Sequence, residues 1–353
     1  MSKEIQSSGL YTKIAELLNA ARHNVVRAVN KTMVYTYFEI GRMIVEDEQH
    51  GKERAEYGKQ VLKELSAKLS KEFGKGFSVQ NLENMRKFYL IYSVGTISDE
   101  DSRSAIRISE KSQSPIRISE NSASALSWTH YLVLIRIENN EERNFYEIEA
   151  LNNNWSVREL KRQFDSALYE RLVLSRDKEG VKQLSEKGQI IEKPVDILKD
   201  PYILEFLNLP EHHQYSESEL EKEIIDKLEN FLLELGKGFT FVGRQVRFTF
   251  DEKHFKVDLV FFNRILRSFV VIDLKIGELT HQDLGQIQMY VNYYDRFVRL
   301  PDENKTIGIV LCKDKSETLV EITLPEDNNT IFASRYKTVL PDKQDFIRLL
   351  EQD

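Results

Sequence analysis

The stretch HFKVDLVFFNRILRSFVVIDLKIGE, residues 254–278, carries the pattern that decides the fold of the second half of this 353-residue chain. Its first part, HFKVDLVFF, alternates in polarity, and its later part, RSFVVIDLK, is rich in β-branched residues, so both are typical of strands. The connection from Asn263 to Leu266 is short enough for an antiparallel hairpin. The stretch therefore predicts two neighbouring strands, with Asp258 in the first and Asp273 near the end of the second.

The flanking residues complete a domain around this hairpin. On the N-terminal side, SESELEKEIIDKLENFLLELG predicts a helix capped by Ser216 or Ser218 and ended by Gly236, and FTFVGRQVRFTF predicts a further strand. On the C-terminal side, HQDLGQIQMYVNYYDRFV predicts an amphipathic helix, TIGIVLCK a buried strand and FIRLL a closing helix. Up to the last strand, the predicted order is α-β-β-β-α-β.

The chain is longer than one hydrophobic core usually supports, so we expect two domains. Helical periodicity predicts a helical domain over residues 1–180. Within it, residues 97–124 contain the imperfect repeat SAIRISEKSQ and SPIRISENSA, which predicts an exposed or disordered insertion. Proline-containing residues 181–205 read as a linker, and residues 206–353 as the second domain.

Two helix starts in the first half, FSVQNLENMRKFY and WSVRELKRQFDSALY, place basic and amide side chains after an N-capping serine. The first follows the glycine-containing turn FGKGF, which is the layout of a DNA-binding helix-turn-helix. Packed helices adopt the same layout without DNA, and the basic residues could equally form a solvated face. The candidate DNA contacts are Asn81, Asn84, Arg86, Lys87, Arg158 and Arg162.

Composition limits the class of protein. The net charge is −7, and the acidic excess lies in residues 201–353, which hold 19 Lys and Arg against 27 Asp and Glu. This balance argues mildly against general nucleic-acid coating but is compatible with a cleft that holds divalent cations. No apolar run approaches the roughly 18 residues of a membrane span, and no secretory signal pattern is present, so we expect a cytoplasmic protein without membrane contact. The single cysteine, Cys312, fits a reducing compartment.

The hairpin also carries the candidate chemistry. Adjacent antiparallel strands can bring Asp258 and Asp273 together, and two carboxylates about 4 Å apart repel by roughly 4 kcal/mol at an effective dielectric of 20. A divalent cation such as Mg²⁺ or Mn²⁺ removes this conflict and can polarise a phosphate and activate water. Lys275, two residues after Asp273, faces the same side and can stabilise charge there. The alternative is a plain ion pair between Asp273 and Lys275.

The hairpin residues resemble the PD-(D/E)xK nuclease superfamily, and more closely its YhcG-like branch. The resemblance extends over nearly the whole chain, through FSVQNLENMRKFY, LSWTHYL, NNWSVRELKRQF, FLLELGKGF and DENKTIGIVLCKDK. It implies a multidomain α plus α/β fold in which a helical N-terminal domain precedes a restriction-endonuclease-like αβββαβ core. It also implies that Asp258 and Asp273 are metal ligands and that Lys275 is catalytic. Val257 replaces the motif's proline, a common departure that leaves the metal ligand intact.

The resemblance implies further site residues on the two helices. A glutamate of the leading helix often completes such a site; we select Glu221, with Glu219 and Glu223 as alternatives. The segment QIQMY is similar to the Q-x-x-x-Y element of RecB-like nucleases and would place Gln286 and Tyr290 at the site, where they would position DNA or surround the lysine. Packing is the competing role for both, more so for Tyr290.

These observations predict a Mg²⁺- or Mn²⁺-dependent DNA endonuclease with a role in repair, recombination or defence. Two alternatives remain open. The nuclease core could be a catalytically silent DNA-binding scaffold, or the helical half could be a protein-interaction module that brings the nuclease into a homo-oligomer or to partner proteins.

Overall fold

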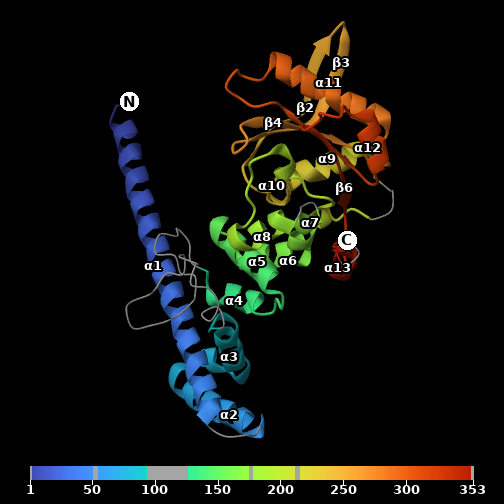
Figure 1. Cartoon of the computed structure of the whole chain (residues 1–353). Coiled ribbons are helices and arrows are strands. Elements are labelled where there is room, and N and C mark those ends of the chain that lie inside the picture. The colour runs from blue at the N-terminus through green and yellow to red at the C-terminus, as the bar shows by residue number, and fades with distance from the viewer. Residues whose placement is uncertain (1, 51–54, 94–125, 175–177, 211–214, 351–353) are drawn as a thin grey trace. The chain divides into compact units, whose positions relative to one another are not determined.

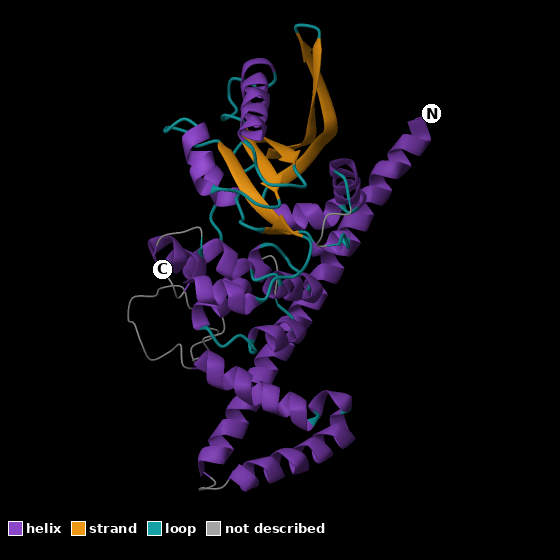
Figure 2. Cartoon of the chain, turned by 90° about the vertical axis from the view of Figure 1, so that its right-hand side faces the viewer, coloured by secondary structure: helices purple, strands orange, loops and turns teal. Residues whose placement is uncertain are grey.

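The computed structural model describes residues 2–50, 55–93, 126–174, 178–210 and 215–350, and the predicted insertion over 97–124 lies outside them. The chain forms two compact units, Met1–Lys161 and Arg162–Asp353. Figure 1 labels their elements, and Figure 2 shows that the described strands belong to the second unit. The predicted combination of a helical N-terminal region with a C-terminal mixed sheet is confirmed.

The regular elements among the described residues of the first unit are all helices. Its elements are α1 (Ser2–His50), α2 (Ala55–Phe73), the short 3-10 helix η1 (Lys75–Phe77), α3 (Val79–Ser93), α4 (Trp128–Leu134), α5 (Asn140–Asn152) and the start of α6 (Val157–Asp165). Helices α1 and α3 pack closely at Gly41, because glycine has no side chain. A Cβ at this position would lie only 2.1 Å from the carbonyl oxygen of Met85. Phe88 of α3 is fully buried and packs on the rings of Trp128 and Tyr131 of α4.

The second unit contains a six-stranded sheet in the order β1-β6-β5-β4-β3-β2. Strands β2, β3 and β4 form an antiparallel meander, whereas β4, β5, β6 and β1 run parallel. The elements are α7 (Leu168–Val173), α8 (Lys178–Lys187), η3 (Pro194–Ile197), β1 (Tyr202–Ile203), η4 (Glu205–Leu207), α9 (Glu217–Asp226), α10 (Leu228–Leu235), β2 (Phe239–Phe250), β3 (Lys253–Asn263), β4 (Ser268–Leu274), α11 (His281–Phe297), β5 (Ile307–Cys312), α12 (Glu317–Thr323), β6 (Ile331–Lys337) and α13 (Lys343–Leu350).

The predicted order α-β-β-β-α-β is found in α9 and α10, β2, β3, β4, α11 and β5. The leading helix differs in one detail, since it is divided at Lys227 into two helices. Helices α9 and α10 cover one face of the sheet, and α11 covers the other. Helix α11 lies so close to β5 that a Cβ at Gly308 would come within 2.8 Å of the side chains of Ile287 and Val291.

The segment that we expected to be a linker, residues 181–205, differs from that expectation. It holds part of α8 and the whole of β1, which pairs with β6 through Tyr202 opposite Tyr336. Tyr202 and Ile203 are fully buried and extend the sheet of the second unit. The prolines suggested a loop, but a two-residue strand is too short to give a periodic signal, and only its pairing with β6 defines it.

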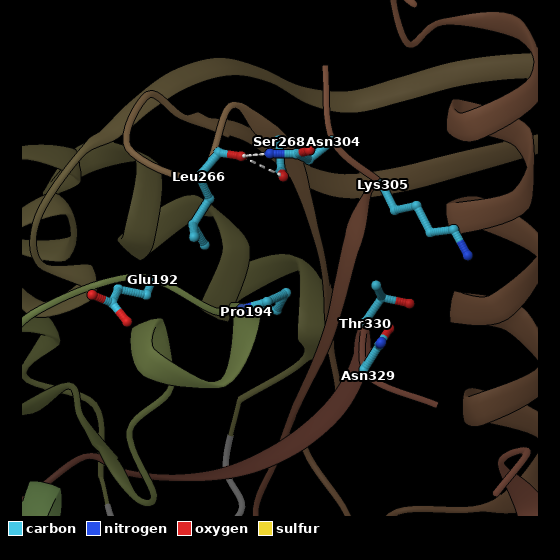
Figure 3. Close-up of a pocket in the computed structure, with 8 residues that line it drawn as sticks. All are labelled: Glu192, Pro194, Leu266, Ser268, Asn304, Lys305, Asn329 and Thr330. Carbon is cyan, nitrogen blue, oxygen red and sulfur yellow. Dashed lines mark hydrogen bonds between the residues drawn. The ribbon is translucent and has the colours of Figure 1, made fainter. Parts of the chain in front are cut away.

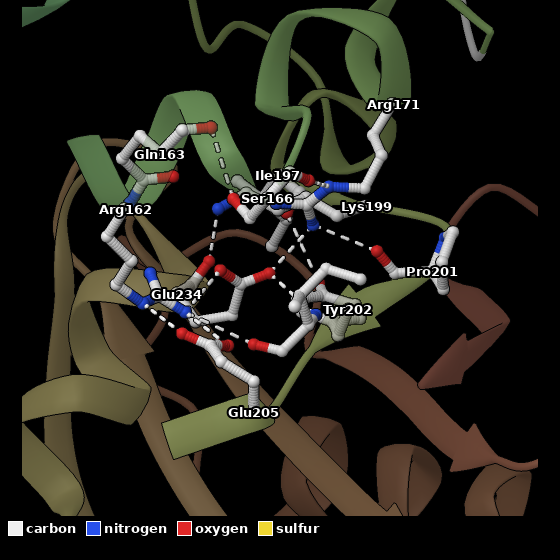
Figure 4. Close-up of polar contacts among 11 residues, drawn as sticks. Arg162, Gln163, Ser166, Arg171, Ile197, Lys199, Pro201, Tyr202, Glu205 and Glu234 are labelled. Carbon is white, nitrogen blue, oxygen red and sulfur yellow. Dashed lines mark hydrogen bonds and ion pairs between the residues drawn. The ribbon is translucent and has the colours of Figure 1, made fainter. Parts of the chain in front are cut away.

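A buried ionic network, drawn in Figure 4, lies within the second unit. Glu234 of α10 is fully buried; its carboxylate contacts Arg171 of α7 at 2.8 Å and Arg162 of α6 at 3.2 Å, and its backbone carbonyl accepts a hydrogen bond from Lys199. Arg162 also contacts Glu205 at 2.9 Å. The structure argues against the predicted contact of Arg162 with DNA, because its guanidinium is held in this network and its side chain is only 12% exposed.

The network also sets the charge state of its central carboxylate. Burial alone would raise the pKa of Glu234, but Arg171, Lys199 and Arg162 outweigh that effect and lower it to about 2.

None of the helices in the described ranges combines the length and apolar character that a bilayer crossing requires.

Candidate active site

The antiparallel pairing of β3 with β4 places Asp258 and Asp273 on neighbouring strands at one edge of their hairpin. Leu259 opposite Ile272 is the last pair of the β3–β4 ladder at this end, and Asp258 and Asp273 are the next residues on the two strands. The Oδ2 atom of Asp258 accepts a hydrogen bond of 2.9 Å from the backbone N–H of Leu274. The register thus brings the two predicted aspartates together.

Asp273 is 1% exposed, so burial acts on its carboxylate. Burial raises the pKa of Asp273 to about 7; the charge of Asp258 acts in the same direction, and Lys275 acts against it. The ammonium of Lys275 lies 3.0 Å from Oδ2 of Asp273. Although burial alone would lower the pKa of Lys275, the neighbouring carboxylates raise it, so the lysine is held as a cation.

Glu221 of α9 joins this edge through Gln245 of β2. The amide nitrogen of Gln245 donates to Oε2 of Glu221 at 2.8 Å and to Oδ1 of Asp258 at 3.0 Å. Burial, followed by the charge of Asp258, raises the pKa of Glu221. Of the two alternative glutamates, Glu219 caps α9 through Ser216, and Glu223 pairs with Lys227 at 3.0 Å.

Gln245 has a left-handed backbone, with φ of 47°, which is uncommon for a residue other than glycine. Strand β3, which pairs with β2 here, changes the side of the sheet on which its apolar residues pack. Leu259 packs in the core cluster against α9, whereas Val257, two residues earlier on the same strand, packs in the cluster against α11. Alternate residues of a regular strand share a face, so the regular alternation of β3 is interrupted where Gln245 lies opposite Asp258.

Helix α11 supplies the second contact to Asp273. The amide nitrogen of Gln286 lies 3.4 Å from Oδ1 of Asp273 and also donates to the hydroxyl of Tyr290. Tyr290 in turn donates to the carbonyl oxygen of Lys256 at 2.8 Å and is 2% exposed. The structure therefore brings Gln286 to Asp273 and buries Tyr290 beside it, which favours a packing role for the tyrosine.

Three neighbours of the site were missed at the sequence level. Besides Gln245, Glu217 and Asp283 lie 3.8 Å and 3.9 Å from the ammonium of Lys275. Asp283 also caps α11 by accepting from Thr280. The capping pattern of T-x-x-D was a usable signal for Asp283, but nothing in the sequence indicated that Gln245 would face two carboxylates.

The predicted DNA contacts of the helical unit divide into two groups. The side chain of Asn81 donates to the carbonyl oxygen of Gly76 at 2.5 Å and accepts from the indole of Trp128 at 2.9 Å. Both ends of the Asn81 amide are thus engaged within the helical unit, which argues against the predicted contact of Asn81 with DNA. Arg86 pairs with Glu48 at 2.6 Å.

The remaining candidates lie at the surface. Lys87 and Arg158 are exposed, and Asn84 is half-buried; within the described residues these side chains form no hydrogen bond or ion pair. The helix, turn and helix arrangement itself is present as α2, η1 and α3, with Gly74 at φ 91° before the turn.

The side chains at this edge include the carboxylates that a divalent cation such as Mg²⁺ prefers as ligands. Oδ2 of Asp273 is buried and, within the described residues, has only the ammonium of Lys275 beside it, and the carboxylates of Asp258 and Glu221 converge on a single amide nitrogen. In the described part of the chain no three Asp, Glu, His or Cys residues form a ready metal cluster. Mg²⁺ needs only one or two protein carboxylates, because water and substrate phosphates complete its shell.

A cavity of about 300 Å³ opens elsewhere on the second unit (Figure 3). It lies where β4 begins, at Ser268, whereas Asp273 lies where β4 ends, so the cavity is not part of the candidate site. Its lining residues are Glu192, Pro194, Leu266, Ser268, Asn304, Lys305, Asn329 and Thr330.

Both units of the chain are similar to known proteins. Residues 195–351 match the family model described as the YhcG PDDEXK nuclease domain, and residues 13–171 match the DUF1016 N-terminal domain. The chain is 41% identical over 343 residues to "Putative nuclease YhcG" of Escherichia coli (strain K12), covering 95% of this chain and 91% of that protein.

Solved structures give a weaker likeness. A repair endonuclease from Pyrococcus abyssi is 16% identical with a TM-score of 0.24, covering 38% of this chain and 50% of that chain. A structure of an EndoMS complex with double-stranded DNA is also 16% identical, with a TM-score of 0.25 and the same coverage.

Proposed function

The chain belongs to the YhcG family of PD-(D/E)xK nucleases, and from this premise we propose that it is a divalent-metal-dependent endonuclease that hydrolyses DNA phosphodiester bonds. The observation that carries the proposal is the convergence of Asp258, Asp273 and Lys275 at one edge of the β3–β4 hairpin. Glu221, joined to Asp258 through Gln245, supports it.

The proposed roles follow from these contacts. Asp258 and Asp273 would hold Mg²⁺ or Mn²⁺, with Glu221 as a third carboxylate. The bound ion would supply a water of lowered pKa and polarise the scissile phosphate. Lys275, kept cationic by Asp273, would stabilise negative charge on the phosphate or orient the attacking water. Gln286 would hold Asp273 in position.

The test is cleavage of supercoiled, linear and branched DNA with Mg²⁺ or Mn²⁺. We expect the natural chain and the control Asp226→Ala, an exposed carboxylate on α9, to cleave, and Asp273→Ala to be inactive. Activity that survives both Asp273→Ala and Lys275→Ala would refute the assignment. Retention of DNA without cleavage under either metal would instead favour the catalytically silent DNA-binding protein.

For the helical unit we propose DNA recognition through Asn84, Lys87 and Arg158, the predicted contacts whose side chains are not engaged in the packing of that unit. The rival role is assembly, with a second copy or with partner proteins. Lys87→Glu distinguishes them: weaker duplex binding with unchanged mass in light scattering supports recognition. Unchanged binding with altered mass supports assembly.

A further inference from the structure

The β2–β3 hairpin reaches beyond the rest of the sheet (Figures 1 and 2). Strand β4 pairs only with residues 259–263 of β3, whereas β2 continues to pair with β3 from Val246 opposite Val257 to Phe250 opposite Lys253. We call residues 246–257 the outer hairpin. An isolated two-stranded ribbon is marginal in water, so this one needs support from the rest of the unit.

That support comes from an aromatic face packed on α11. Phe248 stacks on Tyr293 with ring centroids 4.0 Å apart and meets Tyr290 edge-on at 5.6 Å. Phe255, opposite Phe248 on the neighbouring strand, stacks on it at 5.6 Å. These contacts hold the outer hairpin in one orientation relative to the candidate site.

The other face of the outer hairpin is cationic. Arg247 lies directly opposite Lys256, and the next pair is Thr249 opposite His254; all four residues are exposed. Within the described residues no carboxylate forms an ion pair with Arg247, Lys256 or the nearby Arg244. Like charges placed directly opposite each other destabilise a sheet, so this pair has a cost that an anionic ligand would remove.

Two of these cations, Lys256 and Arg244, lie close to candidate-site residues along their strands. Lys256 precedes Asp258 by two residues, and Arg244 precedes Gln245. The side-chain amide of Gln245, the residue after Arg244, contacts both Glu221 and Asp258. The only carboxylates of the outer hairpin, Asp251 and Glu252, form the turn at its far end.

We propose that the outer hairpin is a phosphate-binding arm, in which Arg247 and Lys256, with Arg244 nearest the site, hold the backbone of duplex DNA beside Asp258 and Asp273. The inference deepens the proposed function and rests on it. Duplex DNA suits the arm because it presents one phosphate charge per about 1.7 Å of its axis, and a sequence-independent contact to phosphate needs only exposed cations on a rigid support. Asp251 and Glu252, in the turn at the far end of the outer hairpin, lie beyond the residues proposed to contact phosphate.

The test compares two doubly neutralised chains. Arg247→Gln with Lys256→Gln removes the opposed pair of the arm. The matched control, Arg264→Gln with Lys305→Gln, removes two exposed cations at the other end of the strands, one after β3 and one before β5. Binding of a labelled mixed-sequence 30-base-pair duplex is measured by fluorescence anisotropy without divalent metal, over a range of salt concentrations, and thermal unfolding confirms that each chain is folded.

We expect the arm variant to bind duplex DNA at least about tenfold more weakly than the natural chain. The slope of log K against log salt concentration should be smaller in magnitude by about two, and the control should bind like the natural chain. Unchanged binding by the arm variant, or an equal loss in both variants, overturns the arm. A natural chain that binds through the arm but does not cleave with Mg²⁺ or Mn²⁺ refutes the nuclease proposal alone. A natural chain that binds no duplex refutes both.

Discussion

The ammonium of Lys275 lies 3.0 Å from the buried Oδ2 of Asp273, although the two residues are only two positions apart in the chain. The pair looks like a simple structural ion pair, but Glu217 and Asp283 also lie within 4 Å of the same ammonium. A lysine that served only Asp273 would not need further carboxylates, so its surroundings are those of a site with excess negative charge.

Lys275→Met removes this cation while keeping a long side chain. We expect the rate of Mg²⁺-dependent cleavage to fall by about 100-fold or more, because charge on the phosphate loses its stabilising partner. Duplex binding should change by less than about threefold. The control is Lys222→Met, an exposed lysine next to Glu221. Cleavage by Lys275→Met within about twofold of the natural rate would contradict the role assigned to the lysine.

Two substitutions of Gln245 distinguish its contribution to cleavage from the strain of its backbone. Gln245→Gly and Gln245→Ala both remove the amide that joins Glu221 to Asp258, so both should slow cleavage, by about tenfold or more. The glycine variant should be the more stable by about 1 kcal/mol, because φ of 47° is unstrained for glycine and strained for alanine. Urea unfolding measures the difference; equal stability of the two variants would argue against strain at this residue.

Glu234 predicts a pH dependence of stability. Its pKa is about 2 in the folded chain and 4.5 as the ordinary value, so its contribution is present above pH 4.5 and is lost as the pH falls towards 2. The separation corresponds to about 3 kcal/mol at neutral pH. We expect Glu234→Gln to lower the free energy of unfolding of the second unit by at least that amount near pH 7, because Arg171 is left buried without a countercharge.

The same difference should shrink towards zero near pH 2, where Glu234 itself becomes neutral. Denaturant unfolding followed by circular dichroism between pH 2 and 7 measures it. Glu186→Gln, which removes half of an exposed pair 3.9 Å long, should show no comparable pH-dependent difference. A difference for Glu234→Gln that stays constant over this range would show that the carboxylate does not hold its charge in the folded chain.

Tyr290→Phe tests the role of the Q-x-x-x-Y tyrosine. The substitution keeps the ring that Phe248 contacts but removes the hydroxyl bonded to Lys256 and Gln286. We expect a loss of about 1 kcal/mol in unfolding free energy and unchanged affinity for duplex DNA, because the side chain is buried. A large loss of DNA affinity at unchanged stability would restore the predicted DNA contact.

The difference between Arg158 and Arg162 illustrates what local sequence cannot reveal. Both lie in the same basic helix start, four residues apart, yet Arg158 is exposed and Arg162 is held by Glu205 and Glu234. The partners are 43 and 72 residues away along the chain. Exposure to DNA depends on that long-range packing, which helical periodicity does not encode.

The sequence by itself determined the order of helices and strands around residues 254–278 and the meeting of Asp258 with Asp273, because strand alternation and a short turn fix the register of a hairpin. Only the tertiary structure placed Gln245 between the carboxylates of Glu221 and Asp258 and turned one face of the outer hairpin against α11. Those features depend on twist and on contacts between distant elements, for which the chain carries no local pattern.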